Sequence, residues 1–148
     1  MPGVAFNHVG HCVGDLARAR RFYEELLDFE FEREISPPDD PSATLLRMKP
    51  PIGMTACYLR RDGLVLELLH FEDAGTVPHA ERVMNEPGLT HLSLSVDDVD
   101  DVCRRVPDHG GEVLEDSNIG VGIFVRDPDG QLIELLPMSY RTRLDASA

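Results

Sequence analysis

Two glutamates occupy the same place in two similar apolar segments of the chain. Glu67 lies in GLVLELLH (63–70), and Glu134 lies in GQLIELLP (130–137). Each apolar run has the length and composition of a strand that is buried on both faces. An ionised carboxylate in such a strand is costly unless it is paired or coordinates a metal ion. For a single glutamate, pairing with an arginine or a place at a strand edge is the ordinary explanation.

Two histidines repeat in step with the glutamates. The segments NHVGHCVGDLARARRF (7–22) and THLSLSVDDVDDVCRR (90–105) align without gaps and place His8 on His91. Each segment begins as a strand and changes to helical spacing after an aspartate that is suited to cap the helix N-terminus. The chain therefore carries two related modules, each with one histidine and one glutamate at matching positions.

The modules have predictable boundaries. An Asp-Gly pair, at 62–63 and at 129–130, opens each glutamate segment and predicts a hairpin with the strand before it. We expect two copies of strand–helix–strand–strand–strand, in residues 4–71 and 89–137, joined by a linker at 72–88. The histidine and the glutamate are closer in sequence in the second copy, so we expect that copy to lack about one strand and its loop.

Strand alternation predicts where the special side chains point. His8 and His91 alternate with aliphatic residues against which the following helix would pack, so both imidazoles lie on the face without the helix. If helices also cover the opposite faces of the strands that carry Glu67 and Glu134, two imidazoles and two carboxylates converge in an apolar cup. A register shift of one residue would reverse this orientation.

Composition limits the classes of protein to consider. A chain of 148 residues with 42% hydrophobic residues suits a single domain, or two small halves that share a core. A net charge of −13 speaks against a nucleic-acid partner. No apolar run is long enough to span a membrane, and no signal peptide is evident. The three cysteines predict neither a disulfide framework nor a thiolate zinc site, so we expect a cytoplasmic protein.

Four segments together resemble the vicinal oxygen chelate superfamily. This superfamily includes glyoxalase I, methylmalonyl-CoA epimerase, type I extradiol dioxygenases and the bleomycin- and fosfomycin-resistance proteins. The resemblance covers residues 4–137, and the segments that carry it are NHVGHCVGDLARARRFYEELLDFEF, GLTHLSLSVDDVDDV, HGGEVLED and FVRDPDGQLIELLP. It implies an α+β fold in which two paired βαβββ modules form a curled mixed sheet around a metal cup, with helices on the outer face. On this basis residues 1–148 are expected to form a single domain.

The resemblance also implies a metal site and its chemistry. The family's metal positions fall on His8, Glu67, His91 and Glu134. Two imidazoles and two carboxylates leave two positions of one octahedral divalent ion (Fe, Ni, Co, Mn or Zn) open for the vicinal oxygens of a small substrate. In glyoxalase-like members a glutamate moves the proton next to the substrate carbonyl, which makes Glu134 or Glu67 the expected catalytic base.

The number of ligands favours one branch of the superfamily. Extradiol dioxygenases and fosfomycin-resistance enzymes use only the counterparts of His8, His91 and Glu134, whereas glyoxalase I and the epimerase fill the position of Glu67 as well. The resemblance therefore implies a divalent-metal-dependent, glyoxalase-like isomerase or lyase. An Fe(II) ring-cleaving dioxygenase and a drug-sequestering protein of the bleomycin-resistance type are the alternatives. The segment LLHFED (68–73) lacks the family's usual tripeptide-thiol-binding residues.

Assembly and a few further side chains complete the expectations. The resemblance implies a homodimer, with the metal site either within one chain or shared between two subunits. His11 and His70 are expected to be packed or edge histidines rather than ligands. Tyr58 and Tyr140 are either hydrogen-bond donors to substrate or, as is more ordinary, partly buried tyrosines with a satisfied hydroxyl.

Overall fold

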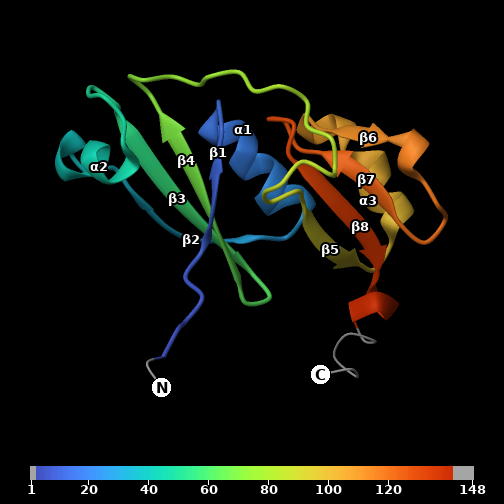
Figure 1. Cartoon of the computed structure of the whole chain (residues 1–148). Coiled ribbons are helices and arrows are strands. Elements are labelled where there is room, and N and C mark those ends of the chain that lie inside the picture. The colour runs from blue at the N-terminus through green and yellow to red at the C-terminus, as the bar shows by residue number, and fades with distance from the viewer. Residues whose placement is uncertain (1–2, 142–148) are drawn as a thin grey trace. The chain divides into compact units, whose positions relative to one another are not determined.

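The computed structural model describes residues 3–141 and divides the chain into two compact units, Met1–Pro78 and His79–Ala148. Each unit contains one four-stranded mixed sheet with its own helices (Figure 1). The predicted α+β class and the repeated strand–helix–strand–strand–strand order are confirmed. Between the last strand of the first unit and the first strand of the second, residues 72–91 contain no helix or strand.

The first unit has the strand order β1-β4-β3-β2. Strand β1 runs parallel to β4, and the other neighbours are antiparallel. Its elements, in chain order, are β1 (Val9–Cys12), α1 (Leu16–Arg20), the π-helical turn η1 (Arg21–Leu26), β2 (Glu30–Ile35), α2 (Asp39–Leu46), β3 (Met54–Arg61) and β4 (Leu64–Phe71). The edge strand β2 is exposed along its length and carries three glutamates and an arginine, which is typical of a protected sheet edge.

The second unit repeats this arrangement with the order β5-β8-β7-β6, and β5 runs parallel to β8. Its elements are β5 (Leu92–Val96), α3 (Val99–Arg105), the 3₁₀ turn η2 (Pro107–His109), β6 (Glu112–Leu114), the 3₁₀ turn η3 (Glu115–Ser117), β7 (Ile123–Arg126) and β8 (Leu132–Pro137). The expectation that this copy lacks a strand was wrong. The first unit is longer because it inserts α2 and its flanking loops between β2 and β3.

Capping aspartates start the corresponding helices of both units. An Asp15 carboxylate oxygen accepts a hydrogen bond from the backbone N–H of Arg18 at 2.9 Å, and Asp98 accepts one from Asp101 at the same distance. These bonds satisfy backbone donors that the first helical turn leaves free, so the predicted helix starts are confirmed.

None of the helices within residues 3–141 has the length and apolar character needed to cross a membrane.

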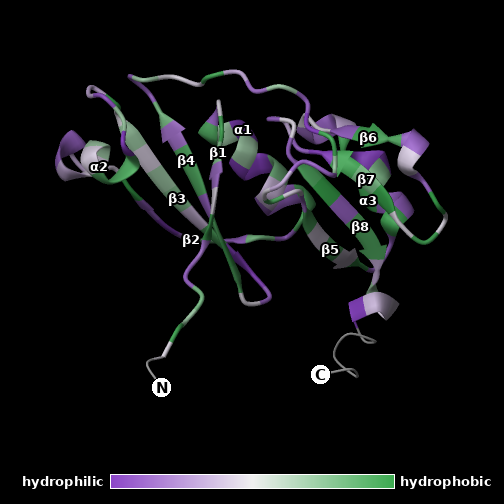
Figure 2. Ribbon diagram, viewed as in Figure 1, coloured by the Kyte–Doolittle hydropathy of each residue, from purple (hydrophilic) through white to green (hydrophobic). Residues whose placement is uncertain are grey.

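The core of each unit lies on the helix side of its central strand. In β4, Leu66 and Leu68 are 1% and 0% exposed, and in β8 Ile133 and Leu135 are both 0% exposed. Figure 2 shows β8 as a mainly hydrophobic strand with a hydrophilic interruption. In the first unit these strand residues share the core with apolar side chains from the α1–η1 segment and its flanks: Val13, Ala19, Phe22, Tyr23, Leu26, Leu27 and Phe29. The second unit uses Val102 and Val106 of α3 and its C-terminal cap in the same way.

A smaller apolar cluster covers part of the opposite face of the first sheet. Ala43 of α2 and Ile52 pack with Phe71 of β4, and partly buried neighbours, Leu69 among them, surround them. Leu69 and Phe71 lie on the same side of β4 as Glu67, because alternate residues share a face. The inserted segment therefore closes the face that carries Glu67 at the C-terminal end of the strand.

The two hairpins differ in the length of their turns. Arg61 pairs with Leu64 across a two-residue turn, in which Asp62 and Gly63 have φ values of 47° and 81°, as a type I′ turn requires. The second hairpin has a five-residue loop, 127–131, since Arg126 pairs with Leu132.

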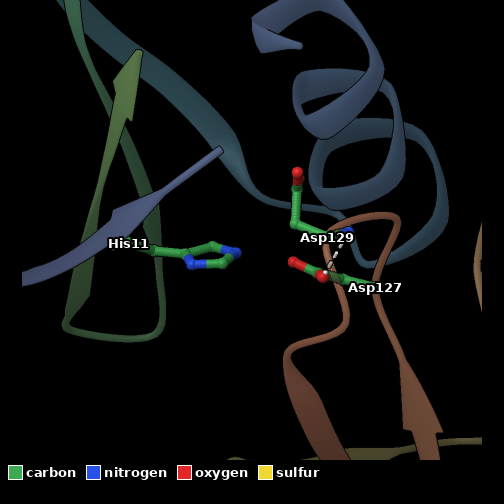
Figure 3. Close-up of side chains that lie close together, drawn as sticks. All are labelled: His11, Asp127 and Asp129. Carbon is green, nitrogen blue, oxygen red and sulfur yellow. Dashed lines mark hydrogen bonds between the residues drawn. The ribbon is translucent and has the colours of Figure 1, made fainter. Parts of the chain in front are cut away.

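A buried carboxylate organises this second loop. Asp127 is 3% exposed, and its Oδ1 accepts backbone hydrogen bonds from Asp129 at 2.8 Å and Gln131 at 2.9 Å. Figure 3 shows the first of these bonds, between the two aspartates of the β7–β8 loop. The loop leads directly into β8, the strand that carries Glu134.

Truncation of a core leucine tests the side of β4 that faces the helix. Leu68→Ala is expected to lower the free energy of unfolding by about 3 kcal/mol, because it leaves a cavity in a closed core. Leu45→Ala, in α2, removes the same atoms from a side chain that is 82% exposed and should change it by less than about 0.5 kcal/mol. Urea denaturation of both variants measures the difference. Equal losses would contradict the assignment of the buried face.

Candidate functional site

Each unit brings its own histidine and glutamate together. The Nε2 atom of His8 lies 3.3 Å from Oε1 of Glu67, and the Nε2 atom of His91 lies 4.0 Å from Oε1 of Glu134. Each histidine immediately precedes the first strand of its unit, β1 or β5. The four residues that the repeat singles out thus form two matching His–Glu pairs, one on each sheet.

Strand register explains why the two pairs match. Gly10 of β1 lies opposite Glu67 in the parallel pairing with β4, and Ser93 of β5 lies opposite Glu134 in β8. Each histidine lies two residues before that position, on the same face of its strand. The face is the one opposite the buried leucines of β4 and β8, as the alternation predicts.

In each imidazole, the other ring nitrogen, Nδ1, has a hydrogen-bond partner on the side chain of the preceding residue. Nδ1 of His8 is 2.5 Å from Oδ1 of Asn7, and Nδ1 of His91 is 2.8 Å from Oγ1 of Thr90. When Nδ1–H donates to these oxygens, Nε2 keeps its lone pair toward the glutamate. A fixed tautomer of this kind is the usual support for a metal-ligating histidine.

A hydroxyl donor holds each carboxylate. The Tyr58 hydroxyl donates to Oε2 of Glu67 at 2.5 Å, and the Ser93 hydroxyl donates to Oε1 of Glu134 at 2.7 Å. These donors come from different strands: Tyr58 lies opposite its glutamate on β3, and Ser93 lies opposite its glutamate on β5. Each glutamate therefore has a hydroxyl donor on its own sheet.

The aromatic residues beside the imidazoles are also related by the repeat. The His8 ring meets the Tyr58 ring edge-on, with centroids 5.6 Å apart, and the His91 ring meets Phe124 in the same way at 5.1 Å. Tyr58 and Phe124 each lie opposite the glutamate of their own sheet. One aromatic ring thus supports the imidazole in each unit.

Burial sets the protonation of the tyrosine. Burial, followed by the hydrogen bond to Glu67 and the negative charge of that carboxylate, raises the pKa of Tyr58 to about 12, against a smaller lowering by Arg33. The Arg33 guanidinium lies 4.5 Å from the centroid of the Tyr58 ring. The hydroxyl therefore keeps its proton at neutral pH and remains a donor.

The donor atoms of both pairs fit a first-row divalent ion. Two atoms bound at about 2.0–2.2 Å from one ion are roughly 3 Å apart at a right angle and never more than about 4.4 Å apart. The distances of 3.3 Å and 4.0 Å between Nε2 and Oε1 fall in this range. Imidazole nitrogen and carboxylate oxygen are ligands that Fe, Co, Ni, Mn and Zn accept.

Sequence reasoning missed most of the supporting side chains. The repeat predicts no role for Asn7, Thr90 or Ser93, although each lies within two residues of one of the repeated histidines. For Tyr58, the structure supports the ordinary expectation of a satisfied hydroxyl, with Glu67 as its partner. His70, expected to be a packed or edge histidine, has its Nε2 atom 3.2 Å from Glu72, whose side chain is 82% exposed.

Comparison with known sequences identifies relatives over most of the chain. Residues 5–135 match the model of the Glyoxalase/Bleomycin resistance protein/Dioxygenase superfamily. A probable lactoylglutathione lyase of Synechocystis sp. is 30% identical over 134 residues, which cover 87% of this chain and 92% of the relative. A lactoylglutathione lyase of Neisseria meningitidis is 28% identical over 129 residues, covering 84% of this chain and 83% of the relative.

Solved structures agree with the sequence comparison. The trypanothione-dependent glyoxalase I of Leishmania major superposes with a TM-score of 0.70 at 25% identity, over 95% of this chain and 91% of that one. A glyoxalase family protein of Bacillus cereus, at 18% identity, shares the fold with a TM-score of 0.76 over 93% of this chain and 95% of that one. With the repeated His–Glu modules and the family match across residues 5–135, the chain belongs to the glyoxalase, bleomycin resistance protein and dioxygenase superfamily, the vicinal oxygen chelate proteins.

Proposed function

We propose that the chain is a divalent-metal-dependent, glyoxalase-like lyase or isomerase that moves a proton on the carbon next to a substrate carbonyl. The observation that carries the proposal is the repeated His–Glu pair, with Nε2 and Oε1 separated by 3.3 Å in one unit and 4.0 Å in the other. A drug-sequestering protein does not require two His–Glu pairs in which Nδ1 of each imidazole has a hydrogen-bond partner. The lactoylglutathione lyases among the relatives favour the same reaction class.

The proposed site combines both pairs around one divalent ion. His8, Glu67, His91 and Glu134 would hold it, and the ion, once bound, would supply Lewis-acid polarisation of the substrate carbonyl. When Nδ1–H donates to Asn7 or Thr90, the imidazole keeps Nε2 available. A glutamate, Glu134 or Glu67, takes the proton from the carbon next to the carbonyl and returns it to the neighbouring position.

The proposed substrate is a small molecule with vicinal oxygens. Adducts of methylglyoxal with thiols and acyl-CoA epimers both place an acidic C–H next to a carbonyl, so both suit a base positioned in this way. The lactoylglutathione lyase relatives, of which the match covers 92% and 83%, favour the thiol adducts. We further propose that residues 1–148 act as one cytoplasmic domain and that two copies form a homodimer.

Metal analysis of the purified protein tests the ligand set. The wild-type chain is expected to carry close to one divalent ion. Glu67→Ala and His91→Ala should each weaken metal binding by more than about 10–100-fold. That range is the usual effect of losing a residue that supports a ligand without binding the ion itself. The matched control is His70→Ala, since His70 belongs to a third His–Glu pair, with a separation of 3.2 Å, that the repeat does not contain. Full occupancy in Glu67→Ala would favour the three-ligand, dioxygenase-like site.

Hydrogen exchange tests the reaction class. In deuterated water, a thiol adduct of methylglyoxal should take up deuterium next to the carbonyl only when the protein is loaded with metal. Glu134→Gln should slow the exchange by about 10²–10⁴-fold, the usual contribution of a general base. Glu72→Gln, which changes a carboxylate that is 82% exposed, should leave the rate unchanged. Oxygen consumption and ring cleavage of catechols, without exchange, would contradict the proposal.

Subunit complementation tests whether the site is shared between two chains. Each unit supplies one histidine, so His8→Ala and His91→Ala chains should both be inactive alone. If the pairs of two chains combine, a mixed dimer contains one site without histidines and one intact site, and activity should partly return after subunit exchange. If exchange is demonstrated and activity does not return, both pairs of a site belong to one chain.

A further inference from the structure

The two half-sites differ in how they hold the glutamate. In the second unit the donor is Ser93, and the aromatic residue opposite Glu134 is Phe124, which has no hydroxyl. In the first unit the residue that corresponds to Ser93 is Gly10, and the aromatic residue opposite Glu67 is Tyr58. The hydroxyl donor to the carboxylate thus lies on the parallel strand in the second unit and on the antiparallel strand in the first.

The hydroxyl of Tyr58 has a defined position. Tyr58 is 8% exposed, and three side chains surround it on the face that carries Glu67. Its ring meets the His8 ring edge-on, the Arg33 guanidinium covers the ring at 4.5 Å, and its hydroxyl donates to Glu67 at 2.5 Å. Each contact restricts the ring, so the hydroxyl oxygen cannot move away from the carboxylate without loss of the ring contacts.

The two oxygens of Glu67 have separate partners as a result. Oε2 accepts the hydrogen bond from Tyr58, whereas Oε1 lies 3.3 Å from Nε2 of His8. In the second unit a single oxygen, Oε1 of Glu134, has both the hydroxyl contact and the proximity to the histidine. Only the first unit therefore divides the roles of the two carboxylate oxygens.

We propose that Tyr58 is a positioning residue that occupies Oε2 of Glu67 and thereby presents Oε1 as the single metal-ligating oxygen of that side chain. This inference rests on the proposed metal centre. Tyr58 acts through Glu67 and touches neither the ion nor the substrate. Without its hydroxyl, the carboxylate is free to rotate or to use both oxygens, so the metal should bind more weakly and in a different coordination.

The test measures Co(II) affinity by competition with a chromophoric chelator, in a double-mutant cycle. Tyr58→Phe should weaken Co(II) binding by about 10–100-fold, the usual effect of removing an outer partner of a ligand, and should alter the visible absorption bands of the bound Co(II). In a Glu67→Ala chain the same change should have less than about a twofold effect, because the side chain through which Tyr58 acts is gone. Tyr140→Phe, which removes a phenol hydroxyl after β8, should change neither affinity nor spectrum.

The outcomes separate this inference from the proposed function. If the wild-type chain binds no Co(II), the metal centre and this inference both fail. If it binds Co(II) and Tyr58→Phe binds with the same affinity and spectrum, only the role of Tyr58 is overturned. An equal loss in the wild-type and Glu67→Ala backgrounds also overturns it, because the hydroxyl would then act on the fold rather than through Glu67. Circular dichroism of the metal-free variants accompanies each measurement.

Discussion

Glu67 and Glu134 lie in the middle of otherwise apolar strands, and the chain must provide each carboxylate with polar partners where it lies. A carboxylate in such surroundings is unfavourable without hydrogen bonds or an opposing charge. Both sheets provide a hydroxyl donor from a neighbouring strand, and in both an imidazole from the residue before the first strand lies beside the carboxylate. Helices α1 and α3 lie on the opposite face of their sheets, whereas α2 packs on the face of β4 that carries Glu67.

The two carboxylates nevertheless have different surroundings. The Glu67 side chain is 13% exposed and that of Glu134 is 30% exposed. The insert that contains α2 contributes to the difference, because its apolar cluster with Leu69 and Phe71 begins two residues beyond Glu67 on the same face of β4. The second unit has the short 3₁₀ turn η3 rather than an α-helix between its corresponding strands, β6 and β7. The repeat therefore fixes the position of both glutamates, while the insert changes the surroundings of one.

Much of this arrangement follows from the sequence, and the rest required coordinates for identifiable reasons. The repeat predicts both His–Glu pairs, because a parallel strand pairing in the same register recurs in both units. The contact between Tyr58 and Glu67 could have been predicted, since a two-residue turn at 62–63 places these residues opposite each other. The stacking of Arg33 on Tyr58 could not be predicted in this way. The register between β2 and β3 shifts between Phe31 and Arg33, so the partner of Arg33 does not follow from its position in the sequence. Sequence spacing also could not distinguish an inserted helix from an extra strand.

We propose that the two His–Glu pairs, His8–Glu67 and His91–Glu134, combine around one ion. X-ray absorption at the metal edge of Co(II)-loaded protein tests it most directly, because imidazole rings give a recognisable multiple-scattering pattern. Each unit contributes one of the proposed histidine ligands, His8 or His91, so a combined site has two imidazoles on one ion, with oxygen ligands and no sulfur. We expect this pattern if the two His–Glu pairs share one ion. A Co(II) ion with one imidazole, or with none, would contradict it.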